Sequence, residues 1–214
     1  MKTGILFDLD GTLLNTLEDL LDATNVALRQ FGCPERTLAE LRTFEGNGAR
    51  NQIRLSLPGR EDDPELEEVL AFYKEYYSGH CQNKTAPYPG VLEALAELSE
   101  YPLAIVSNKP DAAVKTLCAQ YFPGVYALGE AADCPRKPAP DMVFKAMKAI
   151  GVEKCIYVGD SEVDIRTARN AGVPCVSVLW GFRDRDVLEE EGGQHFCDTT
   201  GGMVALIREL SHGQ

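Results

Sequence analysis

Residues 5–14, ILFDLDGTLL, begin as an apolar run and end in two aspartates, a glycine and a threonine. A short run without polar alternation is typical of a strand buried on both faces of a parallel sheet. Asp8 and Asp10 lie two residues apart, so both carboxylates can lean to one side at the strand end, where open parallel sheets bind ligands. Gly11 permits a sharp turn and a close approach of backbone to ligand. Because close carboxylates repel each other, the pair requires a cation or a shared proton.

Three further apolar runs predict strands of the same sheet, at residues 103–106, 155–158 and 173–179. Helical patterns occur at about 90–100, 111–121, 140–150 and 162–171. Strands that alternate with helices indicate βαβ units and a parallel sheet. We therefore expect an α/β fold whose core is a Rossmann-like parallel sheet.

Residues 15–85 interrupt this alternation because they contain no comparable strand run. Helices are expected at about 15–31, 37–43, 47–57 and 64–80, with a polar turn at 58–64. Thr16, followed three residues later by Asp19, is typical of a weak capping box at the first of these helices. We expect two domains: an α/β core of residues 1–14 and 86–214, and an inserted all-helical cap of residues 15–85.

Composition excludes several classes of function. The 214 residues include 21 Lys and Arg against 33 Asp and Glu, a formal net charge of −12 that disfavours nucleic-acid coating and anionic membranes. No apolar run approaches the ~18–20 residues of a membrane span, and no signal peptide is recognisable. Seven scattered cysteines and three histidines give little support to a zinc site. We expect free thiols in a reducing cytoplasm; monomer and homodimer both stay open.

Polar residues also follow the later strands. Ser107 and Asn108 come directly after the second predicted strand, where a hydroxyl and an amide can donate to phosphate oxygens. Lys137 lies in a proline-rich loop and can present a point charge to phosphate. Asp160 and Asp164 follow the third strand and would share one face of a helix that starts there. Each feature alone also fits an ordinary turn, a solvated lysine or a helix cap.

Four motifs in order resemble those of the haloacid dehalogenase-like superfamily: Asp8 with Asp10, Ser107, Lys137, and Asp160 with Asp164. The helical insert between the first two motifs is similar to the all-helical cap of some members. RTFEGNGA, residues 42–49, looks like the cap loop of phosphoglycolate phosphatases, and SNKP, residues 107–110, resembles their second motif. The resemblance implies a Mg²⁺-dependent phosphatase of a small phosphorylated metabolite, with phosphoglycolate as the first expectation.

The same resemblance implies roles for individual residues. Asp8 would be the nucleophile that forms an aspartyl-phosphate, and Asp10 the general acid and base. The expected Mg²⁺ ligands are the Asp8 carboxylate, the Asp10 main-chain carbonyl and the Asp160 carboxylate. Ser107 and Lys137 would hold the phosphoryl group.

Supporting roles follow for neighbouring residues. Thr12 would position the nucleophile or bind phosphate, and Asp164 would orient the motif lysine or a metal-bound water. Gly11 and Asn108 are expected to contact the substrate. Arg50 or Arg54 could pair with a substrate carboxylate, because a guanidinium group binds carboxylates in a bidentate manner.

Other functions stay open at this point. Nucleotides, sugar phosphates and pyrophosphate are alternative substrates. A phosphoglucomutase-type isomerase would share core and cap, but the first cap helix lacks the histidine expected from that resemblance. A non-catalytic binding protein is disfavoured because the expected catalytic residues are present. Dehalogenase chemistry is disfavoured because Asp10 and Asp160 fit phosphoryl transfer better.

Overall fold

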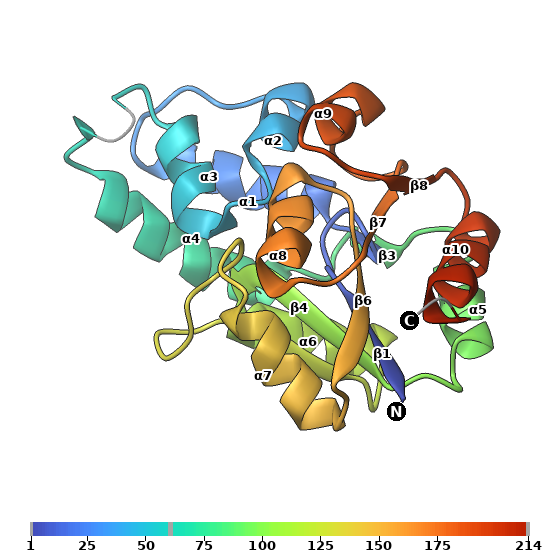
Figure 1. The fold of residues 1–214 in the computed structure, drawn as a ribbon. Helices are drawn as coiled ribbons and strands as arrows, with labels where there is room; N and C mark the ends of the chain where they lie inside the picture. Colours follow the sequence, from blue (N-terminus) through green and yellow to red (C-terminus); the bar gives the residue numbers. More distant parts are fainter. Residues whose placement is uncertain (1, 60–61, 213–214) are drawn as a thin grey trace.

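The computed structural model, which describes residues 2–59 and 62–212, is built on a six-stranded sheet in the order β5-β4-β1-β6-β7-β8 (Figure 1). All five neighbouring pairs are parallel. The strands are β1 (Thr3–Phe7), β4 (Leu103–Pro110), β5 (Tyr126–Glu130), β6 (Lys154–Gly159), β7 (Cys175–Val178) and β8 (His195–Cys197). The predicted α/β fold with a parallel sheet is therefore confirmed.

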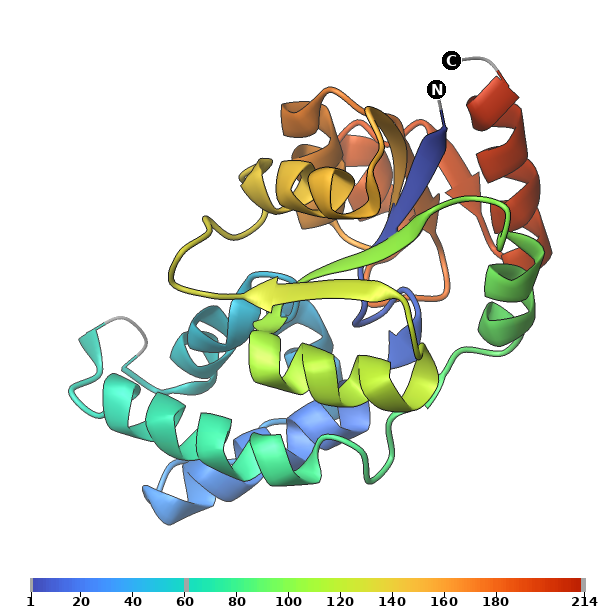
Figure 2. The ribbon, with the colours of Figure 1, turned by 90° about the horizontal axis from the view of Figure 1, so that it is seen from below.

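Helices cover both faces of this sheet (Figure 2). One face carries α7 (Asp141–Ile150) and α8 (Glu162–Ala171), and α9 (Arg185–Glu190) lies beside α8. The other face carries α6 (Asp111–Tyr121) and α10 (Thr200–His212), and α5 (Val91–Glu97) lies beside α10. Leu6 belongs to the apolar cluster on the first face, whereas Ile5 and Phe7 belong to the cluster on the second. This two-sided burial explains why β1 is apolar without alternation.

Four helices without an intervening strand stand over the carboxyl end of the sheet (Figure 1). They are α1 (Leu17–Gln30), α2 (Leu38–Phe44), α3 (Gly48–Ser56) and α4 (Leu66–His80). Two short strands, β2 (Leu14–Asn15) and β3 (Ala86–Pro87), pair where the chain leaves the sheet and returns. We call residues 16–85 the cap segment; its separation as a domain stays a prediction. The polar turn predicted at 58–64 lies partly outside the described residues.

Several elements of the core were not predicted. β5 contains a glycine and a glutamate, β8 has only three residues, and α10 includes two adjacent glycines near its start, which disfavour a helix. Neighbouring strands and the sheet surface stabilise these elements in place of local propensity. Within the described ranges, no helix has the length and apolar character needed to cross a bilayer.

The capping box predicted for Thr16 and Asp19 is wrong. The Thr16 hydroxyl donates to Asp10 Oδ1 at 2.6 Å and makes no capping bond to α1. The buried Asp19 carboxylate instead accepts the main-chain N–H groups of Lys84 and Thr85 at 2.9–3.0 Å, and the Thr85 hydroxyl at 2.8 Å. Asp19 therefore ties the start of α1 to the segment that returns from the cap.

Replacing Asp19 with alanine leaves these donors without their acceptor, so we expect the free energy of unfolding to fall by about 2–3 kcal/mol. Denaturant unfolding followed by circular dichroism measures the loss. Asp22→Ala is the matched control, because Asp22 lies on the same helix and forms an exposed ion pair with Lys84 at 2.7 Å; its expected loss is below about 1 kcal/mol. Equal losses would contradict the anchoring role of Asp19.

Candidate active site

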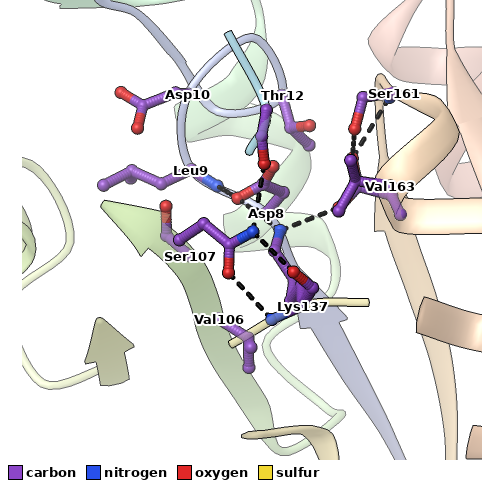
Figure 3. Close-up of polar contacts among 12 residues, drawn as sticks. Asp8, Leu9, Asp10, Thr12, Val106, Ser107, Lys137, Ser161 and Val163 are labelled. Atoms are coloured by element: carbon purple, nitrogen blue, oxygen red, sulfur yellow. Dashed lines mark hydrogen bonds and ion pairs between the residues drawn. The ribbon is translucent and has the colours of Figure 1, made fainter. Parts of the chain in front are cut away.

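The carboxyl ends of the central strands bring together residues that are far apart in the sequence. Figure 3 shows Asp8, Thr12, Ser107 and Lys137 gathered at these ends. A cavity lies between these strand ends and the cap segment. Its lining includes Asp8, Asp10, Ser107 and Asp160 of the sheet side, and Glu45, Gly46, Gly48 and Tyr77 of the cap segment. Residues of the first, second and fourth predicted motifs therefore face the same space as residues of the predicted cap loop, whereas Lys137 and Asp164 are buried behind it.

Asp8 follows directly after β1 and is 6% exposed. Its Oδ1 accepts the N–H of Leu9 at 2.7 Å and lies 2.9 Å from Lys137 Nζ. Burial raises the pKa of Asp8 well above its usual value, and the charge of Asp164 adds to the rise while Lys137 opposes it. The carboxylate is thus held in one orientation, in surroundings that favour a compensating positive charge.

Asp160 is held by donors on both oxygens. Thr12 Oγ1 donates to Oδ1 at 3.0 Å, and the N–H of Phe182 donates to Oδ2 at 2.8 Å. Gly11 has a φ of 79°, and a Cβ there would lie 2.2 Å from Asp160 Oδ2. Only glycine allows the turn after β1 to approach Asp160 this closely. Burial, followed by the charge of Asp164, raises the pKa of Asp160 to about 7.

Asp164 is the most heavily bonded carboxylate of the group. Its Oδ2 caps the start of α8 by accepting the N–H of Asp160, the N–H of Ser161 and the Ser161 hydroxyl at 2.7–3.2 Å. Its Oδ1 accepts Lys137 Nζ at 2.8 Å and the Tyr157 hydroxyl at 3.2 Å. Both oxygens are occupied by protein donors, which suits the predicted role of orienting Lys137.

The acidic groups are suited to a divalent cation. Carboxylate oxygens of Asp8, Asp160 and Asp164 lie within 4.8 Å of one another. Together with Asp10 they make four carboxylates. The buried ammonium groups of Lys137 and Lys109 form ion pairs with this group, so that four negative charges are balanced by only two positive ones. Hard oxygen donors in a buried, negatively charged setting fit Mg²⁺. Because Asp164 is saturated, Asp8 and Asp160 are the carboxylates best placed to bind it.

Lys109 was not assigned a function from the sequence. Its Nζ lies 2.8 Å from Asp10 Oδ1 and 4.7 Å from the centre of the Tyr77 ring. Burial disfavours its charge, but Asp10, Tyr73 and Glu45 together outweigh this effect, and the pKa of Lys109 is raised. The signal available in the sequence was a lysine directly after the Ser107–Asn108 motif at the end of β4.

Ser107 and Asn108 both line the cavity, and Asn108 also bridges three parts of the chain. The Asn108 amide donates to the Gly46 carbonyl at 3.0 Å and to the Lys137 carbonyl at 2.9 Å, and its Oδ1 accepts the Lys137 N–H at 2.8 Å. Both amide hydrogens are therefore engaged within the protein. The side chain joins β4 to the cap segment and to the loop of Lys137, and its contact with substrate stays a prediction.

The arginines predicted to meet a substrate carboxylate do not reach this cavity. The Arg50 guanidinium pairs with Glu67 at 2.8 Å, with both side chains more than half exposed. Arg54 donates to Asn51 at 2.7 Å on the same helix. Neither arginine is in the cavity lining as the described residues define it. The prediction for Arg50 is wrong in this structure because packing of α3 against α4 places the guanidinium beside Glu67.

Arg183 is a cavity residue that sequence reasoning missed. Its guanidinium is paired with Glu162 at 2.7 Å and donates to the carbonyls of Arg42 and Glu45 at 2.9 and 2.6 Å. These bonds fasten residues 42–48, which we call the cap loop, over the carboxyl ends of the strands. No local pattern marks Arg183 in the sequence, because residues 181–200 are rich in glycine and acidic residues.

Comparisons with known proteins agree with this geometry. The family model for haloacid dehalogenase-like hydrolases matches residues 5–178. A phosphoglycolate phosphatase of Mesorhizobium japonicum is 35% identical, with 97% of this chain and 98% of the relative covered. One of Rhodobacter capsulatus is also 35% identical, over 95% and 97% of the two chains.

A solved structure gives the same result in three dimensions. The protein from Lactobacillus delbrueckii subsp. bulgaricus superposes with a TM-score of 0.88 at 38% identity, over 97% of this chain and 99% of that one. The match covers the sheet and the cap segment alike. With its fold, its motif residues in one cavity and a family model that spans most of its length, the chain belongs to the haloacid dehalogenase-like hydrolases.

Proposed function

We propose that the protein is a Mg²⁺-dependent phosphatase that hydrolyses a small phosphate monoester through an aspartyl-phosphate on Asp8. The observation that carries the proposal is the Asp8 carboxylate, which faces the cavity, lies 2.9 Å from Lys137 and belongs to a buried group of three carboxylates. Phosphoglycolate is the proposed substrate, because the relatives that match nearly the whole chain are phosphoglycolate phosphatases.

Asp8 would supply the nucleophile. Leu9 and Lys137 both donate to Oδ1, so we assign the attack on phosphorus to Oδ2. The bond from Oδ2 to phosphorus forms as the bond from phosphorus to the alcohol oxygen breaks. The Ser107 hydroxyl accepts the Lys109 N–H at 3.2 Å, and its own hydrogen would be donated to a phosphoryl oxygen.

Asp10 would act as the general acid and then as the general base. Its protonated carboxyl would give a proton to the departing alcohol oxygen and would later take one from the water that attacks phosphorus. Inorganic phosphate leaves, and the Asp8 carboxylate is regenerated. Thr16 at 2.6 Å and Lys109 at 2.8 Å both bind Asp10 Oδ1, so they would keep the carboxyl oriented between the two steps.

Mg²⁺ would be held by the carboxylates of Asp8 and Asp160 and by the main-chain carbonyl of Asp10. When bound, the ion supplies positive charge that offsets the carboxylates and the phosphoryl oxygens. The protein's part is to keep Asp160 in place through Thr12 and the Phe182 N–H. Lys137 serves the same electrostatic purpose from the opposite loop, and Asp164 fixes its position.

A small substrate fits the enclosed character of the site. The cap loop covers the strand ends, and residues of the cap segment line the space together with Asp8 and Asp160. All seven cysteines are free thiols, which agrees with the proposed location in a reducing cytoplasm.

The proposed activity is tested by phosphate release from a panel of phosphoglycolate, a nucleoside monophosphate, a sugar phosphate and pyrophosphate. Each assay is run with Mg²⁺ and with a chelator. We expect phosphoglycolate to give the highest kcat/KM and the chelator to abolish turnover. Turnover of every substrate without divalent cation would overturn the metal-dependent mechanism. A higher kcat/KM for another substrate would replace phosphoglycolate as the proposed substrate.

Asp8→Asn should lower kcat by at least about a thousandfold, because an amide does not form the phosphoryl intermediate. The substitution keeps the side chain's shape, so the circular dichroism spectrum should be unchanged. Asp133→Asn is the control: Asp133 is exposed and pairs with Lys145 at 3.0 Å on the surface. Turnover by Asp8→Asn at the wild-type rate would remove Asp8 from the nucleophile's role.

Binding of Mg²⁺ should be visible without any assay of activity. At a concentration one hundred times its Kd, the ion should stabilise the fold by about 2.7 kcal/mol, which raises the Tm by about 5–10 °C for a chain of this size. Asp160→Asn should lose this shift because it removes a proposed ligand, whereas Asp133→Asn should keep it. An unchanged shift in Asp160→Asn would show that the cation binds elsewhere.

A further inference from the structure

Two polar atoms on the cap side of the cavity are buried without a hydrogen-bond partner among the described residues: Oε1 of Glu45 and the hydroxyl oxygen of Tyr77. Both residues line the cavity, and they are only 8% and 2% exposed. Buried polar groups in native proteins are nearly always paired, and leaving one unpaired is costly. Two in one cavity indicate that a ligand supplies the missing partners.

The neighbouring polar groups of the cap segment are satisfied within the protein. Tyr73, which stacks on Tyr77 with ring centres 5.6 Å apart, donates its hydroxyl to Gln52 Oε1 at 3.2 Å. Gln52 in turn donates to the Thr24 hydroxyl at 2.7 Å. The unpaired state is therefore specific to Glu45 and Tyr77 and is not a general property of this wall.

Lys109 completes the polar surface of this end of the cavity. Its ammonium group lies over the Tyr77 ring at 4.7 Å and uses one hydrogen for Asp10. An ammonium group has three hydrogens, so the group can donate further to a bound anion. Burial and the charge of Asp10 raise the pKa of Glu45 to about 8, although the nearby cations Lys109 and Arg183 both act to lower it.

We infer that Glu45, Tyr77 and Lys109 form a subsite that binds the carboxylate of the substrate's leaving alcohol. The inference rests on the proposed phosphatase activity and assigns the residues that distinguish a phosphorylated hydroxy acid from a neutral phosphate ester. A carboxylate has about four acceptor positions and no donor. It therefore matches the Lys109 ammonium, the Tyr77 hydroxyl and a Glu45 carboxyl that carries its proton.

The charge distribution favours a carboxylate over a cationic group. The leaving group would enter beside a buried ammonium and a glutamate that is mostly neutral at pH 7. A cation would meet Lys109 in a buried setting, where like charges repel strongly. A hydroxyl group would pair with one or two of the three residues and leave the others unsatisfied.

The test compares phosphoglycolate with ethyl phosphate, an ester with the same two-carbon frame but no terminal polar group, in steady-state assays with Mg²⁺. Tyr77→Phe removes only the unpaired hydroxyl. We expect the KM for phosphoglycolate to rise at least about tenfold, while kcat and the KM for ethyl phosphate change less than about twofold. Glu45→Leu should show the same selectivity, and Glu45→Gln, which retains a donor, should stay near the wild type.

Tyr73→Phe is the matched control, because it removes a neighbouring hydroxyl that is already paired with Gln52. It should leave the KM ratio of the two esters unchanged and lower the Tm. Tyr77→Phe should keep or raise the Tm, since it removes a buried unpaired group. A hydroxyl with a merely structural role would not give both a selective rise in the KM for phosphoglycolate and an unchanged or raised Tm.

The outcomes separate this inference from the proposed function. If the wild type hydrolyses both esters and Tyr77→Phe changes their KM values equally or not at all, the subsite is refuted and the phosphatase stands. If the wild type hydrolyses neither ester, both the subsite and the preference for small monoesters are refuted. A selective rise in the KM for phosphoglycolate supports the subsite.

Discussion

The rest of the structure is arranged around one energetic constraint, which is the free-energy cost of burying several neighbouring carboxylates at the end of one sheet. Asp8, Asp160 and Asp164 lie within 4.8 Å of one another, where burial and the charge of Asp164 both oppose ionisation of Asp8 and Asp160. Lys137 is the main protein group that offsets this cost, through contacts of 2.8 and 2.9 Å to two of them. Its loop, the start of α8 and the glycine turn after β1 are all positioned to maintain this arrangement.

The same constraint explains how the sheet and the cap segment depend on each other. The donors that hold Asp10 come from Thr16 at the start of the cap segment and from Lys109 of β4. The buried anchor at Asp19 then joins α1 to the returning chain. The orientation of one carboxylate is thus linked to the point where the cap segment leaves the sheet.

The sequence predicted the strands and motif residues that depend on local patterns. An apolar run followed by aspartates is readable along the chain, and the structure places Asp8, Ser107 and Asp160 in the lining of one cavity, with Lys137 buried against Asp8. The strands β5 and β8 were missed because neighbours, not composition, stabilise them. Arg50 was misplaced because its partner Glu67 depends on how two helices pack. Glu45 and Tyr77 stand out only once burial shows that their polar atoms lack partners.

The fastening of the cap loop has a consequence for how this protein can diversify. Arg183 and Asn108 hold the loop by the main-chain carbonyls of Arg42, Glu45 and Gly46. Every residue type offers the same carbonyl, so the side chain at position 45 can be exchanged without loosening the loop. Substitutions at position 45 can therefore change which substrates the cavity accepts, while the main-chain bonds that hold the cap loop in place remain. New selectivities are accessible by single substitutions.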